Sequence, residues 1–452
     1  MNEFDAAKDI VSTLQSHGHQ AVFAGGAVRD MVMGLEPHDI DIATSASPDQ
    51  VEFLFPRTVA VGKQFGVIVV LSNDREFEVA TFRTDSKDSD GRRPNSINFA
   101  TMEEDAQRRD LTINGLFFDP IENKIFDFVN GLEDIKDRLI VFIGDADERI
   151  KEDHLRMLRA VRFANRFGFD LVDSTKKALI RNAHLITVGV SPERIKDELD
   201  KMLMLEKPSK AIEMLKDVGL LTLILPEVDI LWNQEQGPKW HSEGNCGLHT
   251  MMVLDEAARL TKDLNVRWAA LLHDTGKPAT DLLKDDGINH SFHGHENVSV
   301  EIAANVMERF KSSNVDKVKV VNMIANHMRV GSVLDMKRST LRKLISRNHF
   351  DGLLTLFEAD CKGSKPADPN ADNEKMNGVL FLKDIIKTME KVKAPRELPP
   401  MLISGNDIFD LGLKPSAVFR TLLDAITDMQ LDGVISTREE ALVELKKLVE
   451  NM

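Results

Sequence analysis

The segment 25–41, GGAVRDMVMGLEPHDID, constrains the fold of this chain more than any other part of the sequence. Its two glycines let backbone N–H groups approach an anion, and Arg29 beside them suits a phosphate group. If residues 39–41 form a strand, the carboxylates of Asp39 and Asp41 project from the same face and share one hard cation. This combination is typical of nucleotidyl transfer, although a glycine turn followed by an acidic surface turn would explain the same residues.

Apolar runs around this segment predict a small mixed sheet with helices packed on it. Residues 21–24 indicate a strand that enters the glycine turn, and a helix is expected over residues 30–34. Further strands are predicted over residues 59–61, 67–71 and 76–82. Glu78 lies in the last of these strands. It is a candidate third carboxylate for the cation, and it also fits an ordinary solvent-facing strand residue.

Composition describes an ordinary protein of about two to four domains for its 452 residues. No run approaches the roughly 18 apolar residues of a membrane span, and the first residues are acidic rather than signal-like, so no membrane association is expected. Two cysteines fit a reducing cytoplasm. The net charge of −15 means that any contact with RNA has to come from a local basic face.

Two arginine-rich segments follow the predicted sheet. Residues 83–94, RTDSKDSDGRRP, indicate either an inert solvated loop or a mobile loop that closes on a triphosphate. The arginines that would close are Arg83, Arg92 and Arg93. In residues 108–114, RRDLTIN, Arg109 and its neighbour either neutralise phosphate charge or pair with the acidic residues at 103–105.

The pattern turns helical after about residue 146, and a helix is predicted over residues 152–163. Asp153 precedes three arginines at every third position, which places them on one side of a helix: Arg156, Arg159 and Arg162. A carboxylate that accepts from an exocyclic amino group, beside an arginine that donates to a ring nitrogen, selects cytosine and adenine. Uracil and guanine reverse that order. The alternative is a surface helix on which Asp153 pairs with Arg156.

Histidine and aspartate gather in a second region, where seven of the thirteen histidines fall between positions 241 and 327. Histidine and aspartate from separate helices are what a divalent metal site in a helical bundle requires, whereas a lone histidine is more often a core residue. The candidate ligands are His249, His273, Asp274, His295, His327 and Asp360. Beyond them, residues 362–396 are expected to form a linker or exposed loop, and residues 403–452 a closing helical segment.

Taken together, these motifs resemble the class II tRNA nucleotidyltransferase and bacterial poly(A) polymerase family over nearly the whole chain. The matching motifs are GGAVRD (25–30), DID (39–41), TFRTD…DGRRP (81–94), RRDLTIN (108–114), EDHLRMLRAVRF (152–163) and SPERI (191–195). Residues 240–360 likewise resemble the HD metal-dependent phosphohydrolase domain that some members carry.

The resemblance implies an α+β chain with a palm-like mixed sheet followed by helical parts. The expected domains are a nucleotidyltransferase head (1–145), a helical neck that carries the base template (146–230), an HD-type body (231–365) and a helical tail (366–452). It also implies roles for site residues. Asp39 and Asp41 would hold Mg²⁺; Gly26, Arg29 and Arg109 would contact the triphosphate; Asp153, Arg156, Arg159 and Arg162 would select CTP and ATP. The HD-type site would hold Ni²⁺, Mn²⁺ or Mg²⁺.

The implied activity is the addition of C, C and A to the 3′ end of tRNA in the cytoplasm. The run 62–66, GKQFG, is similar to the tRNA enzymes rather than to poly(A) polymerases, and residues 90–92 argue against a member that adds only cytidine. Poly(A) polymerase, an enzyme that adds only adenosine, and a phosphohydrolase as the main activity stay open. The chain departs from the family at Gly115, where alanine is usual, and in lacking the frequent loop tyrosine.

Overall fold

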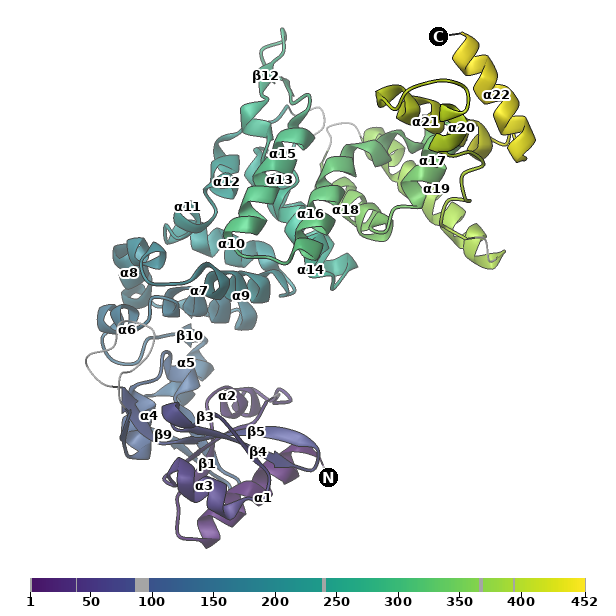
Figure 1. The fold of residues 1–452 in the computed structure, drawn as a ribbon. Helices are drawn as coiled ribbons and strands as arrows, with labels where there is room; N and C mark the ends of the chain where they lie inside the picture. Colours follow the sequence, from purple (N-terminus) through teal and green to yellow (C-terminus); the bar gives the residue numbers. More distant parts are fainter. Residues whose placement is uncertain are drawn as a thin grey trace. The chain divides into compact units, whose positions relative to one another are not determined.

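The computed structural model describes residues 2–37, 39–85, 97–237, 241–365, 369–392 and 395–451 (Figure 1). The chain divides into two compact units, Met1–Asp229 and Ile230–Met452. This division falls next to the predicted boundary after residue 230, while the finer division into four domains stays a prediction. Within the described ranges, no helix combines the length and apolar character needed to cross a membrane.

The first unit begins with a seven-stranded mixed sheet. Its strands in spatial order are β3 (Thr58–Gly62), β4 (Val67–Ser72), β5 (Arg75–Thr81), β2 (Asp41–Thr44), β1 (Ala21–Ala24), β8 (Leu116–Asp119) and β9 (Lys124–Asp127). β2 pairs in parallel with β5, and the other neighbours are antiparallel. The strands predicted over 21–24, 59–61, 67–71 and 76–82 are therefore confirmed within a residue or two of their ends.

Helices cover the sheet because its strands carry apolar side chains toward two separate cores. In β5, Phe77 and Val79 are buried while Glu76 and Glu78 are exposed, which is the alternation of a strand with one solvated face. The larger core takes in α1 (Glu3–Ser16), α2 (Gly26–Val32) and α3 (Pro48–Leu54), and the second core takes in α4 (Met102–Gln107). The helix predicted over residues 30–34 thus begins earlier, directly at the glycine turn.

The expected strand over residues 39–41 is wrong, because β2 begins only at Asp41. Asp39 has a φ of 58°, in the left-handed region that aspartate tolerates better than most residues. The turn at this position lets Ile40 enter the core with 3% of its surface exposed. The two carboxylates are therefore placed by a turn and a strand end, and not by the alternation of one strand.

The helical part of the first unit contains α5 (Gly131–Asp137), α6 (Ala146–Glu152), α7 (Arg156–Phe167), α8 (Asp173–Asn182), α9 (Pro192–Leu203) and α10 (Pro208–Asp217). The prediction of a continuous helix over residues 152–163 is wrong, because the helical conformation is interrupted between the end of α6 at Glu152 and the start of α7 at Arg156. Asp153 has extended backbone angles, and its carboxylate accepts from the backbone N–H of Leu155 at 3.1 Å. Such local side-chain bonds compete with the helix, which explains the break.

The second unit is mainly helical. It contains α13 (Cys246–Leu260), α14 (Leu264–Leu272), α15 (His295–Arg309), α16 (Asn314–Asn326), α17 (Arg338–Ile345), α18 (Phe350–Gly363), α19 (Pro369–Lys391), α20 (Gly405–Phe409), α21 (Ala417–Asp432) and α22 (Arg438–Glu450). A short hairpin of β12 (Leu282–Leu283) and β13 (His290–Ser291) precedes α15.

The linker or loop predicted over residues 362–396 is wrong, because α19 occupies most of it. Val379 and Leu382 of this helix are buried. The proline- and charge-rich start of the segment hid the helical spacing of the apolar residues that follow it. The helical closing segment expected over residues 403–452 is confirmed by α20, α21 and α22.

Candidate functional site

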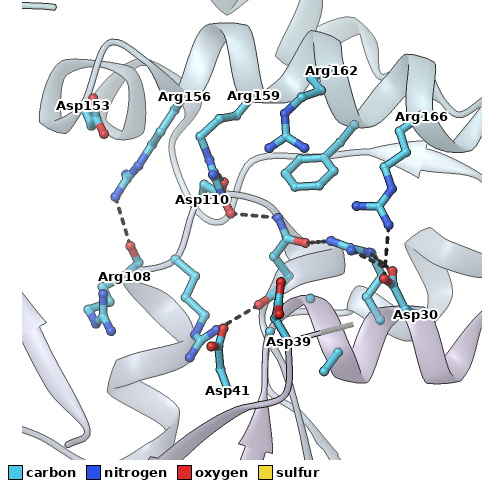
Figure 2. A pocket seen from close by; sticks show the side chains of 17 residues that line it. Asp30, Asp39, Asp41, Arg108, Asp110, Asp153, Arg156, Arg159, Arg162 and Arg166 are labelled. Atoms are coloured by element: carbon cyan, nitrogen blue, oxygen red, sulfur yellow. Dashed lines mark hydrogen bonds and ion pairs between the residues drawn. The ribbon is translucent and has the colours of Figure 1, made fainter. Parts of the chain in front are cut away.

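A cavity of about 650 Å³ in the first unit brings together residues that lie far apart in the sequence (Figure 2). Its charged lining consists of seven arginines and five aspartates, a surplus of two positive charges that favours an anionic ligand. These residues are Arg29, Arg108, Arg109, Arg156, Arg159, Arg162 and Arg166 together with Asp30, Asp39, Asp41, Asp110 and Asp153.

Asp39 and Asp41 form the acidic end of this cavity. Burial raises the pKa of Asp41 to about 6, and the charges of Glu78 and Asp39 add to the rise while Arg109 opposes it. Neighbouring carboxylates that repel one another are relieved by a hard cation, so these residues fit a divalent metal ion. Glu78 lies on β5 beside the start of β2 and acts on Asp41 electrostatically, but it is exposed and does not line the cavity.

The glycine turn also borders the cavity. Gly25 has a φ of 68°, and a Cβ atom there would lie 2.7 Å from Nη1 of Arg109, so glycine leaves room for that guanidinium. Gly26 begins α2, and Arg29 follows one turn later with only 2% of its surface exposed. The Arg29 guanidinium lies over the rings of Phe163 and Phe167 at 5.0 and 4.6 Å, so it ties the turn to α7.

The adjacent arginines Arg108 and Arg109 pair with an acidic residue of the segment 103–105, which is one of the two alternatives that the sequence left open. Arg108 and Arg109 both bind the carboxylate of Asp105, at 2.8 and 3.1 Å. Burial alone would raise the pKa of Asp105, but the two guanidiniums lower it below its usual value. Both arginines still line the cavity, so pairing with Asp105 fixes their positions beside it.

The row of arginines on α7 faces the cavity, and each member has a different partner. Arg156 pairs with Glu152 at 2.7 Å, Arg159 with Asp110 at 2.7 Å and Arg162 with Glu198 at 2.5 Å. Arg159 and Arg162 donate from Nε in these two contacts, so the two contacts do not use the Nη1 and Nη2 groups of either guanidinium.

The expected alternative in which Asp153 pairs with Arg156 is wrong. Asp153 pairs with Arg194 of α9 at 2.8 Å instead. Asp153 and Arg156 nevertheless line the same cavity, so the break between α6 and α7 does not separate the carboxylate from the arginine row.

Sequence reasoning missed four residues, Asp30, Asp110, Asn114 and Arg166, that connect Arg159 of α7 to Arg29 and back to α7. Starting at Arg159 of α7, hydrogen bonds and ion pairs run through Asp110, Asn114, Arg29 and Asp30 and return to α7 at Arg166. Burial would raise the pKa of Asp110, but Arg159 and the neighbouring hydrogen-bond donors hold it at about 2. The four-residue spacings 110–114 and 162–166 are the signals in the sequence that could have revealed these positions.

The loop that was expected to close on a triphosphate is described only in part. The Arg83 guanidinium donates to the backbone carbonyl of Phe65. Arg92 and Arg93 lie outside the described residues. So do all of residues 90–92, which were expected to exclude an enzyme that adds only cytidine.

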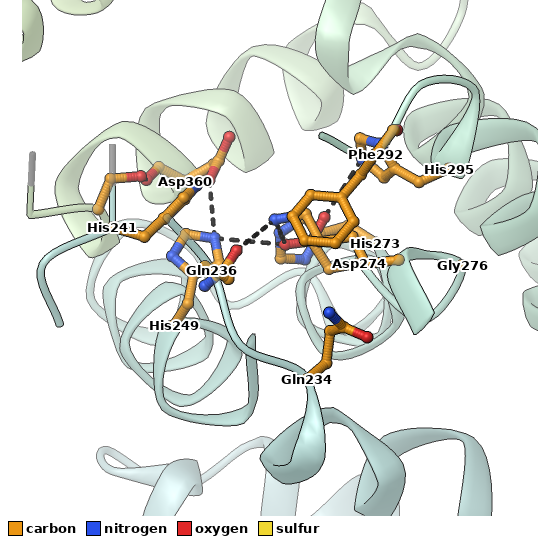
Figure 3. A network of polar contacts seen from close by, with 12 residues as sticks. Gln234, Gln236, His241, His249, His273, Asp274, Gly276, Phe292, His295 and Asp360 are labelled. Carbon is orange, nitrogen blue, oxygen red and sulfur yellow. Dashed lines mark hydrogen bonds and ion pairs between the residues drawn. The ribbon is translucent and has the colours of Figure 1, made fainter. Parts of the chain in front are cut away.

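The predicted histidine and aspartate ligands meet in the second unit, and Figure 3 labels all of them except His327. Among the predicted ligands, two sets of three have their ligand atoms within 4.8 Å of one another. The sets are His249, His273 and Asp360, and Asp274, His295 and His327. Asp274 joins them, because its carboxylate lies 3.5 Å from Nε2 of His249 and 3.3 Å from Nε2 of His295.

Backbone carbonyls set the orientation of three of these imidazoles. Nδ1 of His273, His295 and His327 lies 2.6–2.9 Å from the carbonyl oxygens of residues 270, 292 and 324 respectively. Each Nδ1 therefore donates, and each Nε2 presents its lone pair to the cluster. Nε2 of His249 and of His273 is buried with no hydrogen-bond partner among the described residues, so the cluster fits a divalent metal.

A second cavity, of about 570 Å³, opens beside this cluster. Lys277 and Lys284 line it together with Phe292, and Lys277 forms an ion pair with Asp274 at 2.6 Å. Two cations and an aromatic ring next to a metal-type cluster suit a small phosphorylated ligand. Lys277 ends the run 273–277, HDTGK, that begins with the ligands His273 and Asp274, so its place in the sequence could have shown its part in the site.

Three known family domains match consecutive segments of the chain, in the same order as the motifs in the sequence. The Poly A polymerase head domain matches residues 21–141, the probable RNA- and SrmB-binding site of polymerase A matches residues 168–231, and the HD domain matches residues 247–348.

Among curated proteins, the CCA-adding enzyme of Geobacillus sp. (strain WCH70) is 38% identical over 69% of this chain and 81% of its own length. The CCA-adding enzyme of Geobacillus thermodenitrificans (strain NG80-2) is 45% identical over 49% of this chain, a match that spans about half (54%) of that relative.

Solved structures agree with this assignment of the fold. The Bacillus stearothermophilus CCA-adding enzyme in complex with CTP has a TM-score of 0.70 and 26% identity, with 100% of this chain and 99% of that chain covered. The Thermotoga maritima CCA-adding enzyme complexed with tRNA_CCA, at 16% identity and a TM-score of 0.58 over 99% and 96% of the two chains, shares the fold. The predicted α+β class is confirmed.

Proposed function

This chain belongs to the CCA-adding enzyme family of nucleotidyltransferases, and we propose that it adds C, C and A to the 3′ end of tRNA from CTP and ATP. The observation that carries the proposal is the shared cavity. Asp39 and Asp41 line one end of it and the arginine row of α7 lines another, so one nucleotide reaches both.

The reaction is an in-line attack of the terminal 3′-hydroxyl on the α-phosphate, with pyrophosphate leaving and no covalent enzyme intermediate. Asp39 and Asp41 would hold Mg²⁺, which when bound supplies positive charge to the attacking and leaving oxygens. Arg109 adds positive charge beside these carboxylates, and Arg29 holds the glycine turn against α7. Preorganised charges of this kind stabilise the transition state without reorganising during the reaction.

Base selection falls to Asp153 and the arginines of α7. Asp153 accepts from the exocyclic amino group of cytosine or adenine, while Arg156 donates to the adjacent ring nitrogen. Uracil and guanine present a carbonyl where Asp153 requires a donor, so they are refused. The pairing of Asp153 with Arg194 and of Arg156 with Glu152 holds both groups in place before the nucleotide arrives.

The test is extension of a tRNA that lacks its 3′ end by the purified protein, with each nucleoside triphosphate supplied singly. We expect CTP to be incorporated first and UTP and GTP to be refused. Sustained adenosine tailing of unrelated RNA without use of CTP would instead identify a poly(A) polymerase. Extension only of a tRNA that already ends in two cytidines would identify an enzyme that adds adenosine alone.

A second activity, metal-dependent phosphohydrolysis, is favoured by the two ligand sets, which Asp274 connects through its contacts with His249 and His295. The cluster would hold Ni²⁺, Mn²⁺ or Mg²⁺, and Lys277 and Lys284 would bind a phosphate group beside it. Opening of a 2′,3′-cyclic phosphate by one water, followed by hydrolysis of the resulting monoester by a second, would release phosphate and free the 3′-hydroxyl that nucleotide addition requires. Assays on a 2′,3′-cyclic nucleotide with each metal test this proposal, and His273→Ala should abolish the hydrolysis. Retention of hydrolysis by that variant would contradict the site.

A further inference from the structure

Glu243 lies behind the histidine and aspartate cluster and contacts it through a single ligand. Its side chain is 2% exposed, and its Oε1 lies 3.0 Å from Nδ1 of His249 and 2.8 Å from Nδ1 of His241. These are hydrogen-bond lengths, and an ionised carboxylate only accepts. Both imidazoles therefore donate Nδ1–H to Glu243.

This contact sets His249 apart from the other ligand histidines. The imidazoles of His273, His295 and His327 donate to backbone carbonyls, whereas His249 donates to a carboxylate. With the proton held on Nδ1, Nε2 carries the lone pair, and it lies 3.1 Å from Oδ1 of Asp360, a second member of the same ligand set. A carboxylate partner fixes the tautomer and also makes the imidazole a stronger metal ligand.

Glu243 also connects two helices that carry ligands. Its Oε2 accepts from the backbone N–H of Lys365 at 2.9 Å, and the neighbouring Ser242 donates from N and Oγ to the carbonyl of Lys365 at 2.7 and 2.6 Å. Lys365 lies two residues after the end of α18 (Phe350–Gly363), the helix that carries Asp360. The segment around Glu243 thus holds α18 and His249 of α13 to one another.

We infer that Glu243 is the positioning residue of the metal set His249, His273 and Asp360. This inference rests on the proposed metal site and goes beyond that site by assigning the residue that orients its ligands.

His241, Glu243 and His249 also lie close enough to be a ligand set of their own. However, a metal there would displace both Nδ1–H donors from Glu243, and His249 would have to bind metals through both nitrogens. Hydrogen bonding explains the group more simply.

The experiment measures Mn²⁺ binding to the full chain after chelator treatment, by equilibrium dialysis with metal analysis. The variants are Glu243→Ala and Glu243→Gln, and the matched control is Glu296→Gln. Glu296 lines the neighbouring cavity and lies 3.8 Å from Nδ1 of His295, but that nitrogen donates to the carbonyl of Phe292 instead. The control therefore removes the same charge near a ligand histidine without removing its orienting hydrogen bond.

We expect both Glu243 variants to weaken Mn²⁺ binding by about 10- to 100-fold, with Glu296→Gln remaining close to the wild type. Mn²⁺ should also raise the unfolding temperature of the wild type more than that of Glu243→Gln. If Glu243→Ala does not fold, Glu243→Gln decides the matter. Binding by Glu243→Gln that equals the control would overturn the inference and leave the metal site standing. A wild-type chain that binds no Mn²⁺, Ni²⁺ or Mg²⁺ would overturn the metal site as well.

Discussion

Asn114 is the uncharged member of the contacts that join Arg159 to Arg166, and its amide both donates and accepts. Nδ2 donates to Asp110 at 3.1 Å, and Oδ1 accepts from Arg29 at 2.5 Å. Asn114→Leu should lower the free energy of unfolding by about 1–3 kcal/mol, because it leaves two buried charged groups without this partner. It should also lower kcat/KM for CTP addition. Denaturant unfolding and steady-state kinetics measure the two effects, and unchanged values for both would contradict the role of the amide.

The surroundings of Gly115 explain why this position holds a glycine. A Cβ atom at this position would lie 2.6 Å from Cγ2 of Val129 and 3.2 Å from Cδ1 of Ile143. Gly115→Ala should therefore lower the free energy of unfolding by about 1–3 kcal/mol through overpacking. Val129→Ala in the same chain should recover part of that loss. Strictly additive effects of the two substitutions in a double-mutant cycle would show that the clash is not the cause.

Asp110 supplies a pH dependence whose sign follows from its lowered pKa. Its pKa is about 2 in the folded chain, below the ordinary value near 3.9, so its stabilising contribution is complete above roughly pH 4. That contribution is lost as the pH falls toward 2. The difference in unfolding free energy between the wild type and Asp110→Asn should therefore shrink between about pH 4 and pH 2. A constant difference over this range would contradict the assigned pKa.

At the scale of elements, much of the sheet could be predicted from the sequence, because the segments that form β1, β3, β4 and β5 alternate or run apolar between clear turns, whereas β8 and β9 were not predicted. The break at Asp153 could not be predicted, since Asp153 stands at helical spacing before Arg156 and only its contacts with Leu155 and Arg194 reveal the break. α19 was hidden by its polar start. The candidate ligands of both sites were recognisable by residue type, whereas Asn114 and Glu243 act through neighbours that only the fold brings close.

The template on α7 yields a prediction about nucleotide choice. Asp153→Ala should relax the refusal of UTP and GTP, because the acceptor for the exocyclic amino group is lost. Arg194→Ala is the matched control, since it removes the partner of Asp153 but keeps the acceptor. Competition between CTP and UTP at a single primer end measures the preference. Equal selectivity in wild type and Asp153→Ala would remove Asp153 from base recognition.

At the scale of the whole molecule, the nucleotide cavity and the histidine cluster lie in different compact units. Asp41→Ala should abolish nucleotide addition while Mn²⁺ binding by the second unit persists. His273→Ala should abolish Mn²⁺ binding by the second unit while nucleotide addition persists. Paired measurements of CTP incorporation and metal content on both variants check this separation, and the loss of both properties in either variant would contradict it.

We propose that the enzyme uses one cavity, lined by Asp39, Asp41 and the arginines of α7, for the addition of both cytidine and adenosine to tRNA. The most direct measurement is single-nucleotide extension of two tRNAs, one lacking the last three nucleotides and one ending in two cytidines. The first should accept only CTP and the second only ATP, and Asp41→Ala should extend neither. Use of the same nucleotide on both tRNAs, or extension by Asp41→Ala, would contradict the claim.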